Sequence, residues 1–187
     1  DAYNSQLTRT IADSLSQGFY TTNASQVGGY AVFGGGVSSG TTNIVNAYSE
    51  LLIRTIPTQL SVPRDGILTS YVNGYALFAG GSSYSNEIST VDAYNSGLTR
   101  INPTALSYKR SNGTGVSFGY YALFGGGLNG AEKEDSVEVY DAMLTRTTIT
   151  SLSEPRSYLA SASIQRYALL GGGKGNDYSS TVDVYST

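Results

Sequence analysis

Tyr121-Ala122-Leu123-Phe124-Gly125-Gly126-Gly127 is the stretch that decides the fold of this chain, because it recurs three more times in nearly the same letters. The other copies begin at Tyr30, Tyr75 and Tyr167, so the spacings are 45, 46 and 46 residues. An apolar run of four residues that stops at glycines predicts a short, buried strand. Four copies at this period predict a repeat architecture.

Three further elements keep step with this stretch, and together they define a unit of four strands, a to d. Strand a follows a Leu-Ser pair, and strand b is the Tyr-Ala-Leu-Phe run. Strand c is a Val-x-x-Tyr element, and strand d carries an arginine six residues after that tyrosine. The Leu-Ser pairs begin at Leu15, Leu60, Leu106 and Leu152; the Val-x-x-Tyr elements span 45–48, 91–94, 137–140 and 182–185; the arginines are Arg54, Arg100 and Arg146, with Arg9 after Tyr3. Four short strands per unit, with no helical periodicity, are typical of a β-propeller.

An apolar run ending in Gly-Gly, then an acidic Val-Asp-x-Tyr strand and a turn, resembles the kelch motif of bacterial and phage-type repeats. Pro63-Arg64 and Pro155-Arg156 resemble the Pro-Arg pair that opens a kelch blade. The resemblance covers essentially the whole chain, and it implies a propeller with strand a innermost. Kelch repeats usually carry tryptophan seven residues after the tyrosine, and this chain has none. The positions concerned hold Thr10, Thr55, Ile101 and Thr147.

The fold expected is all-β: one four-bladed propeller with units at about 13–57, 58–103, 104–150 and 151–187 plus 1–12. The last unit lacks a strand d, whereas the first strand d, around 7–11, precedes any blade of its own. We therefore expect the N-terminal strand to complete the last blade and close the ring, because closure removes two open sheet edges. The small residues of strand a suit a tight ring. Two alternatives remain: four blades of a larger ring, or two chains forming an eight-bladed one.

Composition excludes several classes of function. Cysteine and histidine are absent, so there is no Ser-His-Asp triad, no cysteine nucleophile and none of the ligands that zinc and copper prefer. We expect no enzyme activity, no cofactor and no metal site. A net charge of −3 does not suggest a nucleic-acid surface, and no apolar run approaches membrane-spanning length. The pattern at Asp1 begins mid-repeat, which suggests a piece of a larger or processed protein.

The acids of strand c and the arginines of strand d predict structural ion pairs. If the c–d turn is Asn95-Ser96-Gly97, Tyr94 lies opposite Leu98, and Asp92 lies opposite Arg100 on the same face. The same register pairs Glu138 with Arg146 and Asn46 with Arg54, whereas Arg9 is expected to pair with Asp1 or Asp183. A catalytic group is needed once per protein and these pairs recur in each unit, so a structural role is favoured.

A second set of arginines lies where strand d leads into the next strand a: Arg64, Arg110 and Arg156, with Phe19 in the first copy. The d–a and b–c connections of such a blade emerge on one face, so these arginines are candidates for an anion site around a channel mouth. The alternative, which is favoured, is that each guanidinium binds carbonyl groups of a neighbouring blade.

The b–c loops differ most between units, and loops on a rigid scaffold commonly carry binding residues. Their candidates for contact with a sugar or peptide are Tyr84, Asn86, Asn129, Asn176, Asp177 and Tyr178. Glu132, Glu134 and Asp135 offer oxygen ligands for calcium, but Lys133 interrupts them and they lack a calcium-loop spacing. The glycine triplets precede loops rather than helices, so they are expected to provide backbone room and not a phosphate site.

The function expected is a non-catalytic binding or assembly scaffold that presents its b–c and d–a loops to a protein partner within a larger bacterial or phage protein. The alternative is a glycan-binding, lectin-like propeller, although the lack of tryptophan weighs against it. Homo-oligomers are compatible with the pattern. Localisation stays open, with the cell surface or a virion as the expectation for a larger parent protein.

Overall fold

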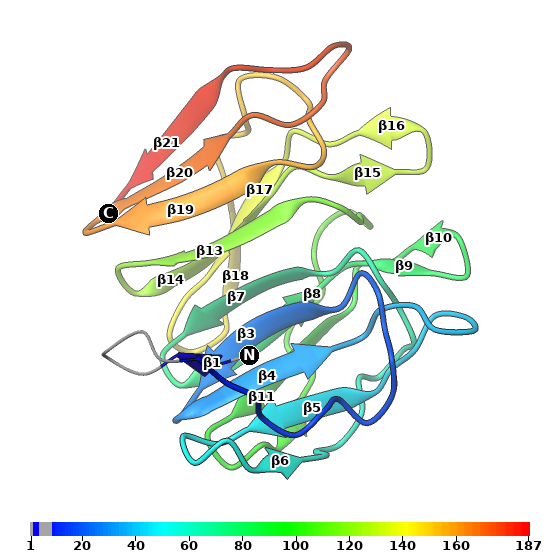
Figure 1. Cartoon of the computed structure of the whole chain (residues 1–187). Helices are drawn as coiled ribbons and strands as arrows, with labels where there is room; N and C mark the ends of the chain where they lie inside the picture. The colour runs from blue at the N-terminus through cyan, green and yellow to red at the C-terminus, as the bar shows by residue number, and fades with distance from the viewer. Residues whose placement is uncertain (1, 4–8) are drawn as a thin grey trace.

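The computed structural model describes residues 2–3 and 9–187, with the side chains from residue 9 onward. These residues form antiparallel strands and no helix, and the principal strands make up four sheets that follow one another along the chain. Figure 1 shows the sheets as a stack, with the N-terminal sheet at one end and the C-terminal sheet at the other. No described helix is long and apolar enough to span a membrane.

Each sheet takes its strands in chain order from one repeat, as the periodicity predicts. Sheet I contains β3 (Asn23–Val27), β4 (Tyr30–Gly34), β5 (Val45–Tyr48) and β6 (Arg54–Thr55). Sheet II contains β7 (Leu68–Val72), β8 (Tyr75–Ala79), β11 (Val91–Asn95) and β12 (Arg100–Ile101). Sheet III contains β13 (Thr114–Phe118), β14 (Tyr121–Gly125), β17 (Val137–Tyr140) and β18 (Arg146–Ile149). Sheet IV contains β19 (Ala160–Ile164), β20 (Tyr167–Gly171) and β21 (Val182–Ser186).

Three small ribbons accompany these sheets. Two of them are hairpins in b–c loops, and Figure 1 shows both projecting on the same side of the stack. The third lies at the N-terminus. The ribbons are β9 (Ser82–Ser83) with β10 (Asn86–Glu87), β15 (Leu128–Asn129) with β16 (Glu132–Lys133), and β1 (Ala2–Tyr3) with β2 (Arg9–Thr10).

The expected closure by the N-terminal strand is wrong for the part of that strand that is described. β2 pairs with β1, in the register Tyr3 opposite Arg9, and not with β21. The remainder of the predicted strand, residues 7 and 8, lies outside the described residues. The first strands of the sheets contact one another in chain order, β3 to β7, β7 to β13 and β13 to β19. Sheets I and IV are therefore the two ends of an open stack.

The core lies between successive sheets, because each sheet buries one face against the next. Between sheets I and II, Val32, Val45 and Ala47 pack against Ala76 and Phe78. Phenylalanine of the second strand and tyrosine of the third form edge-to-face pairs in three sheets, with ring centroids 5.8 to 5.9 Å apart. The pairs are Phe33–Tyr48, Phe78–Tyr94 and Phe124–Tyr140. These aromatic contacts contribute to the packing of each sheet.

The glycine triplets allow the close approach of one sheet to the next connection. Gly80 has a φ of +62°, and a Cβ on it would overlap the carbonyl oxygen of Arg110. The next residue, Gly81, donates its backbone N–H to that same oxygen at 2.8 Å. The prediction of backbone room at a crowded strand end is confirmed, because a side chain at Gly80 would separate sheets II and III.

The first strands face one another through small side chains, as their composition predicts. Ser25 Oγ donates to Ser70 O at 2.6 Å, and Tyr71 N donates to Ser117 Oγ at 2.9 Å. Thr114 and Ser161 share a hydroxyl–hydroxyl bond of 2.7 Å. Serine and threonine therefore connect the first strands of adjacent sheets where a large side chain would hold them apart.

Candidate functional site

The most highly organised polar groups in the molecule surround the carboxylate on the third strand of a sheet. Asp92 on β11 is fully buried, and its Oδ2 accepts a hydrogen bond from Arg64 Nη2 at 2.8 Å. The same oxygen accepts from the backbone N–H and the hydroxyl of Ser61 at 3.1 and 3.0 Å. Its other oxygen, Oδ1, lies 3.6 Å from Arg100 Nε. The side-chain amide of Asn102 also donates to Oδ1, at 2.6 Å. Two arginines, one serine and one asparagine thus bind a single buried carboxylate.

Sheet III repeats the arrangement with glutamate in place of aspartate. Glu138 is fully buried, and its Oε2 lies 3.2 Å from Arg110 Nη2. Its Oε1 lies 3.0 Å from Arg146 Nη1 and accepts from the backbone N–H of Ser107 at 2.7 Å. In sheet IV, Asp183 binds Arg156 and accepts from the N–H of Ser153 at 3.1 Å. The serine of the Leu-Ser pair that precedes each of these three sheets is therefore a carboxylate ligand, which the sequence pattern alone did not reveal.

The contacts predicted between Asp92 and Arg100 and between Glu138 and Arg146 are present, but the predicted register is wrong. Tyr94 lies opposite Arg100 and not opposite Leu98. The three turn residues begin one position later than expected, at Ser96, because Asn95 N donates to Thr99 O. Every pairing is consequently displaced by two residues, and a displacement of two keeps each side chain on its original face. Asp92 and Arg100 therefore meet diagonally instead of directly across the hairpin.

The expected pairing of Arg9 with Asp1 or Asp183 has a different outcome for each acid. Asp1 lies outside the described residues. Asp183 binds Arg156, and β2, which carries Arg9, is not a neighbour of β21 in the sheet.

The second set of arginines does not ring a channel mouth, so the anion-site interpretation is corrected. The side chains of Arg64, Arg110 and Arg156 are fully buried. Each donates to a carbonyl oxygen, as the favoured alternative predicts, but that oxygen belongs to the sheet that the arginine introduces and not to a neighbouring one. Arg110 Nη1, for example, donates to Ser136 O at 2.7 Å. Burial lowers the pKa of the Arg64 and Arg110 guanidinium groups, and the adjacent carboxylates oppose that change. These groups fasten each connection to its own sheet, where a dissolved anion has no access.

Sheet I departs from this arrangement in two positions at once. Phe19 stands where the other connections have arginine, and Asn46 stands where the other sheets have an acid. Asn46 is 1% exposed, and its Oδ1 accepts from the N–H of Ser16 at 3.0 Å. The buried cation and the buried anion are thus both absent from sheet I, which keeps the site neutral apart from the partly exposed Arg54.

The b–c loops place the other predicted residues at the surface. Tyr84 is 70% exposed at the tip of the β9–β10 hairpin, and Tyr178 is 84% exposed in the loop of sheet IV. The two lie on loops of different sheets, with the β15–β16 hairpin of sheet III between them in chain order. The remaining candidates are partly engaged within their own loops: Asn86 with Tyr84 O, Asn129 with Glu134, and Asp177 with the N–H of Tyr178. Asn176 is exposed in the same loop as Asp177.

A hollow of about 510 Å³ lies on this face and reaches Tyr84. Asp65, Glu87, Ser111 and Asn112 contribute polar groups to its lining. These residues are not among the predicted candidates, although Asp65 and Ser111 each directly follow a repeated arginine. Each pairs in the backbone with the first residue of a b–c hairpin, Ser82 or Leu128. That pairing joins the d–a and b–c connections into one surface. The two kinds of connection were expected to emerge on the same face.

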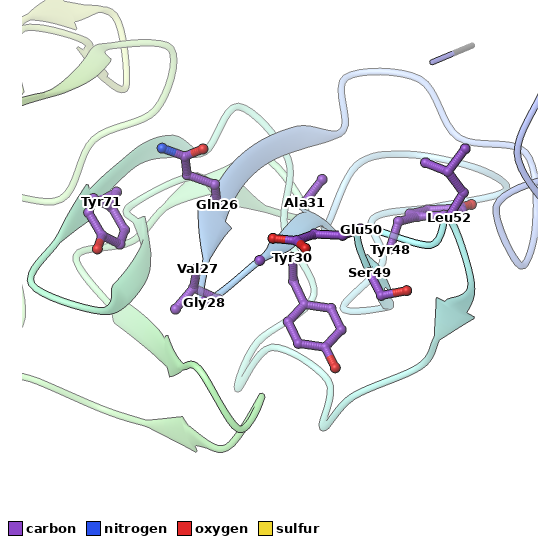
Figure 2. Close-up of a pocket in the computed structure, with 11 residues that line it drawn as sticks. Gln26, Val27, Gly28, Tyr30, Ala31, Tyr48, Ser49, Glu50, Leu52 and Tyr71 are labelled. Atoms are coloured by element: carbon purple, nitrogen blue, oxygen red, sulfur yellow. The ribbon is translucent and has the colours of Figure 1, made fainter. Parts of the chain in front are cut away.

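A second hollow, of about 620 Å³, lies at the opposite end of sheet I. Figure 2 shows Gln26 and Tyr71 on one side of it and Glu50, Ser49 and Leu52 on the other. Glu50 supplies the one carboxylate of its lining. The residues come from strands and turns of sheet I and from β7. Tyr30, Ala31 and Tyr48 belong to the repeated motifs, whereas Gln26 and Glu50 do not.

The acidic loop of sheet III forms internal hydrogen bonds. Glu134 accepts from Asn129 Nδ2 at 3.2 Å and from Ser136 Oγ at 3.3 Å. Within the described residues, no group of three or more acidic, histidine or cysteine side chains is arranged to hold a metal ion.

Comparison with protein-family models gives no match for this chain, and comparison with curated proteins gives none either.

Proposed function

We propose that this chain is a non-catalytic binding and assembly scaffold that presents its b–c and d–a connections to a protein partner. In this proposal the four sheets are consecutive blades of a kelch-type propeller arc, with the first strand of each sheet innermost. The repeat order, the four-stranded sheets and the chain-order stacking support that architecture.

The observation that carries the proposal is the arrangement of the b–c hairpins. β9–β10 and β15–β16 project on the same side of the stack (Figure 1), and their backbones pair with the d–a connections that the buried arginines fasten. The Gly130 N–H also donates to Glu87 Oε2 at 3.1 Å, so that neighbouring hairpins contact each other. A rigid base beneath loops of unlike sequence is the usual form of a protein-recognition surface.

A scaffold role also agrees with the state of the acids. The carboxylates of Asp92 and Glu138 are fully buried and bound by arginine and serine donors, so they are out of reach of a substrate. Exposed Tyr84 supplies the kind of aromatic contact that binding surfaces favour.

A glycan is the second candidate, because of the hollow beside Tyr84. The carboxylates of Asp65 and Glu87 and the amide of Asn112 lie in its lining together with that aromatic ring. Carboxylates and amides bind sugar hydroxyls, and an aromatic face packs on the apolar side of a sugar ring.

Site-specific photo-cross-linking tests the leading proposal. A benzophenone amino acid placed at Tyr84 or Tyr178 is expected to yield a discrete cross-linked protein in an extract of the producing cells. Tyr120 and Met143 are matched controls, because they are 82% and 84% exposed but lie in a–b and c–d turns at the other end of the strands. Equal cross-linking at all four positions, or none, would contradict the proposal. Binding on a glycan array that is lost in Tyr84→Ala would favour the second candidate instead.

A further inference from the structure

Sheet IV leaves uncovered the face that sheets I, II and III bury. Val182 and Val184 on β21 are 53% and 56% exposed, and Ile164 on β19 is 63% exposed. The corresponding residues of sheet III, Val137, Val139 and Phe118, are 0%, 7% and 6% exposed because sheet IV covers them. Among the described residues, sheet IV also has three strands where each of the others has four. The apolar face and the β21 edge therefore both have the form of an internal interface.

The polar groups of sheet IV show the same resemblance to an interface. In sheets II and III the buried carboxylate meets two arginines, one of them from the fourth strand. Asp183 meets Arg156, and its side chain keeps 16% exposure, whereas the side chains of Asp92 and Glu138 have none. An arginine on a strand added to β21 would complete this cluster.

The middle glycine of the sheet IV triplet, Gly172, lacks the crowding that its counterparts in the other triplets have. A Cβ on Gly35, Gly80 or Gly126 would overlap a carbonyl oxygen of the next connection. A Cβ on Gly172 would come no closer than 3.8 Å to its nearest neighbour, Ser179 O. The backbone nevertheless keeps the same left-handed φ, +67°. This strand end is thus shaped to receive the carbonyl of another connection.

The N-terminal hairpin has the geometry of a third and fourth strand. β1 and β2 pair with Ala2 opposite Thr10 and Tyr3 opposite Arg9. β5 and β6 pair in the same register, with Ala47 opposite Thr55 and Tyr48 opposite Arg54. Ala2 and Tyr3 of β1 correspond in the repeat to Val184 and Tyr185 of β21. β1 therefore lies beside β2 where β21 would lie if β2 were the fourth strand of sheet IV. The segment after β2 already covers sheet I as an internal connection would, because Tyr48 Oη donates to Asp13 O as Tyr94 Oη does to Thr58 O.

We infer that a second copy of this chain docks head to tail on sheet IV. Strand β2 of the second copy exchanges β1 for β21 of the first copy and becomes the fourth strand of sheet IV. Sheet I of the second copy then packs on Val182 and Val184, as sheet II packs on sheet I. Arg9 reaches Asp183, and the carbonyl of Phe19 meets Gly172 and Gly173.

The joint uses different surfaces on the two copies, so a ring of two chains or a longer open assembly follows from it. The inference concerns the ends of the stack and is independent of the proposed loop-face function. A chain that fails to assemble can still bind through Tyr84, and the reverse also holds.

Cysteine cross-linking tests the joint directly, because the chain has no cysteine of its own. Val184→Cys and Thr10→Cys are made in separate chains, mixed, and treated with a short bismaleimide. The expected product is a covalent dimer that contains one chain of each variant. Thr55→Cys replaces Thr10→Cys as the matched control, since Thr55 holds the same position on β6 of an intact sheet. A yield no higher than in this control overturns the inference.

A single chain that carries both Val184→Cys and Thr10→Cys distinguishes a joint between two copies from closure within one chain. An intramolecular cross-link that persists on dilution would show cis closure and overturn docking by a second copy. Sedimentation velocity gives an independent measurement, in which Val184→Asp is expected to abolish the assembly. Met143→Asp, at an exposed turn residue, is expected to retain it. A wild-type chain that stays monomeric at high concentration would also refute the inference.

Discussion

At the scale of single residues, each carboxylate cluster holds a buried anion against buried or partly buried arginines, so its positive and negative charges must compensate each other. Arg64 and Asp92 both have 0% exposed side chains, so each has lost its hydration. The removal of one member of a buried ion pair leaves the other uncompensated, which typically costs about 3–5 kcal/mol. The simultaneous replacement of both in sheet I, by Phe19 and Asn46, avoids that cost.

Asp92→Asn is therefore expected to lower the free energy of unfolding by about 3–5 kcal/mol, because Arg64 would remain buried with no anion at contact distance. The double variant Arg64→Phe with Asp92→Asn copies the pair of sheet I and is expected to be more stable than Asp92→Asn alone. Urea unfolding followed by tyrosine fluorescence measures both. A double variant that loses the sum of the two single losses would show that charge balance is not what links these positions.

The buried tyrosines beside these carboxylates make stability sensitive to alkaline pH. Burial first, and the negative charge of Asp92 second, raise the pKa of Tyr94 well above its usual range. Burial likewise raises the pKa of Tyr185 to about 12. A raised pKa in the folded state means that the folded chain binds the proton more tightly than the unfolded chain. The contribution is complete below the unfolded pKa of about 10 and is lost as the pH rises above it.

We expect the free energy of unfolding to fall above pH ~10 by about 1.4 kcal/mol per pH unit for each such tyrosine. Tyr94→Phe should remove one such contribution and make the alkaline decline less steep. Urea titrations at several pH values between about 9 and 11 measure the slope. Tyr120→Phe, at an exposed site, controls for the loss of a tyrosine. An unchanged slope in Tyr94→Phe would contradict the assignment.

At the scale of elements, the strand ends determine how closely two sheets approach. Gly80 and Gly172 have nearly the same backbone, with φ of +62° and +67°, but different neighbours. Alanine meets the same backbone strain at both positions, whereas at Gly80 it also overlaps Arg110 O. Gly80→Ala is expected to destabilise the chain by about 2 kcal/mol more than Gly172→Ala, by the cost typical of overpacking.

Thermal and urea unfolding of the two alanine variants at low protein concentration give this difference. Equal losses would mean that left-handed strain alone, and not the approach of the next sheet, explains the conservation of glycine within the repeats of this chain. A larger loss in Gly172→Ala at high concentration would instead report on the joint between copies.

The strands were predictable from the sequence, whereas their register was not. The Tyr-Ala-Leu-Phe run and the Val-x-x-Tyr element place β14 and β17 within a residue, because an apolar run stopped by glycines has few alternatives. The expected turn, Asn95-Ser96-Gly97, ends at a glycine, whereas the observed turn runs one residue further, to a left-handed position. Leu98 occupies that position, with φ of +57°, and its side chain packs on the core of sheets I and II. Burial of an apolar side chain offsets the backbone strain there, and turn propensities do not include that term.

The partners of the arginines were likewise predictable only where the two residues lie close together in the sequence. The contact of Asp92 with Arg100 was predictable because both residues lie on one hairpin. The contact of Asp92 with Arg64 crosses 28 positions in the sequence and depends on where the d–a connection crosses the sheet. The anion-site hypothesis for Arg64 followed from its place between strands, whereas the side chain turns inward and donates to Phe78 O, a carbonyl partner of the kind that the favoured interpretation predicts.

At the scale of the whole molecule, repeat sequence determines neighbours but not closure. The contacts of β3 with β7 and of β13 with β19 are local, and they are nearly the same whether the stack is open or forms part of a ring. The number of sheets that close a ring depends on the small rotation at each joint, which accumulates along the stack. The sequence therefore predicted the unit and its repetition, whereas the separation of sheets I and IV required the structure.

An open stack also predicts that equivalent residues differ in their contribution to stability. Val139 and Val184 occupy the same position in sheets III and IV, but they are 7% and 56% exposed. Val139→Ala removes two buried methyl groups and is expected to cost about 1.5–2 kcal/mol. Val184→Ala is expected to cost less than about 0.5 kcal/mol in dilute solution, because its side chain faces water in a single copy.

Urea unfolding of both variants over a wide range of protein concentration separates the open stack from its alternatives. If the stack is open and sheet IV receives a second copy, the small cost of Val184→Ala should rise toward that of Val139→Ala as the concentration increases. Equal costs at every concentration would mean that Val184 is covered within one chain, as in a closed ring. A cost at Val184 that stays small at all concentrations would show that the face remains in water, and the head-to-tail joint would then have no apolar basis.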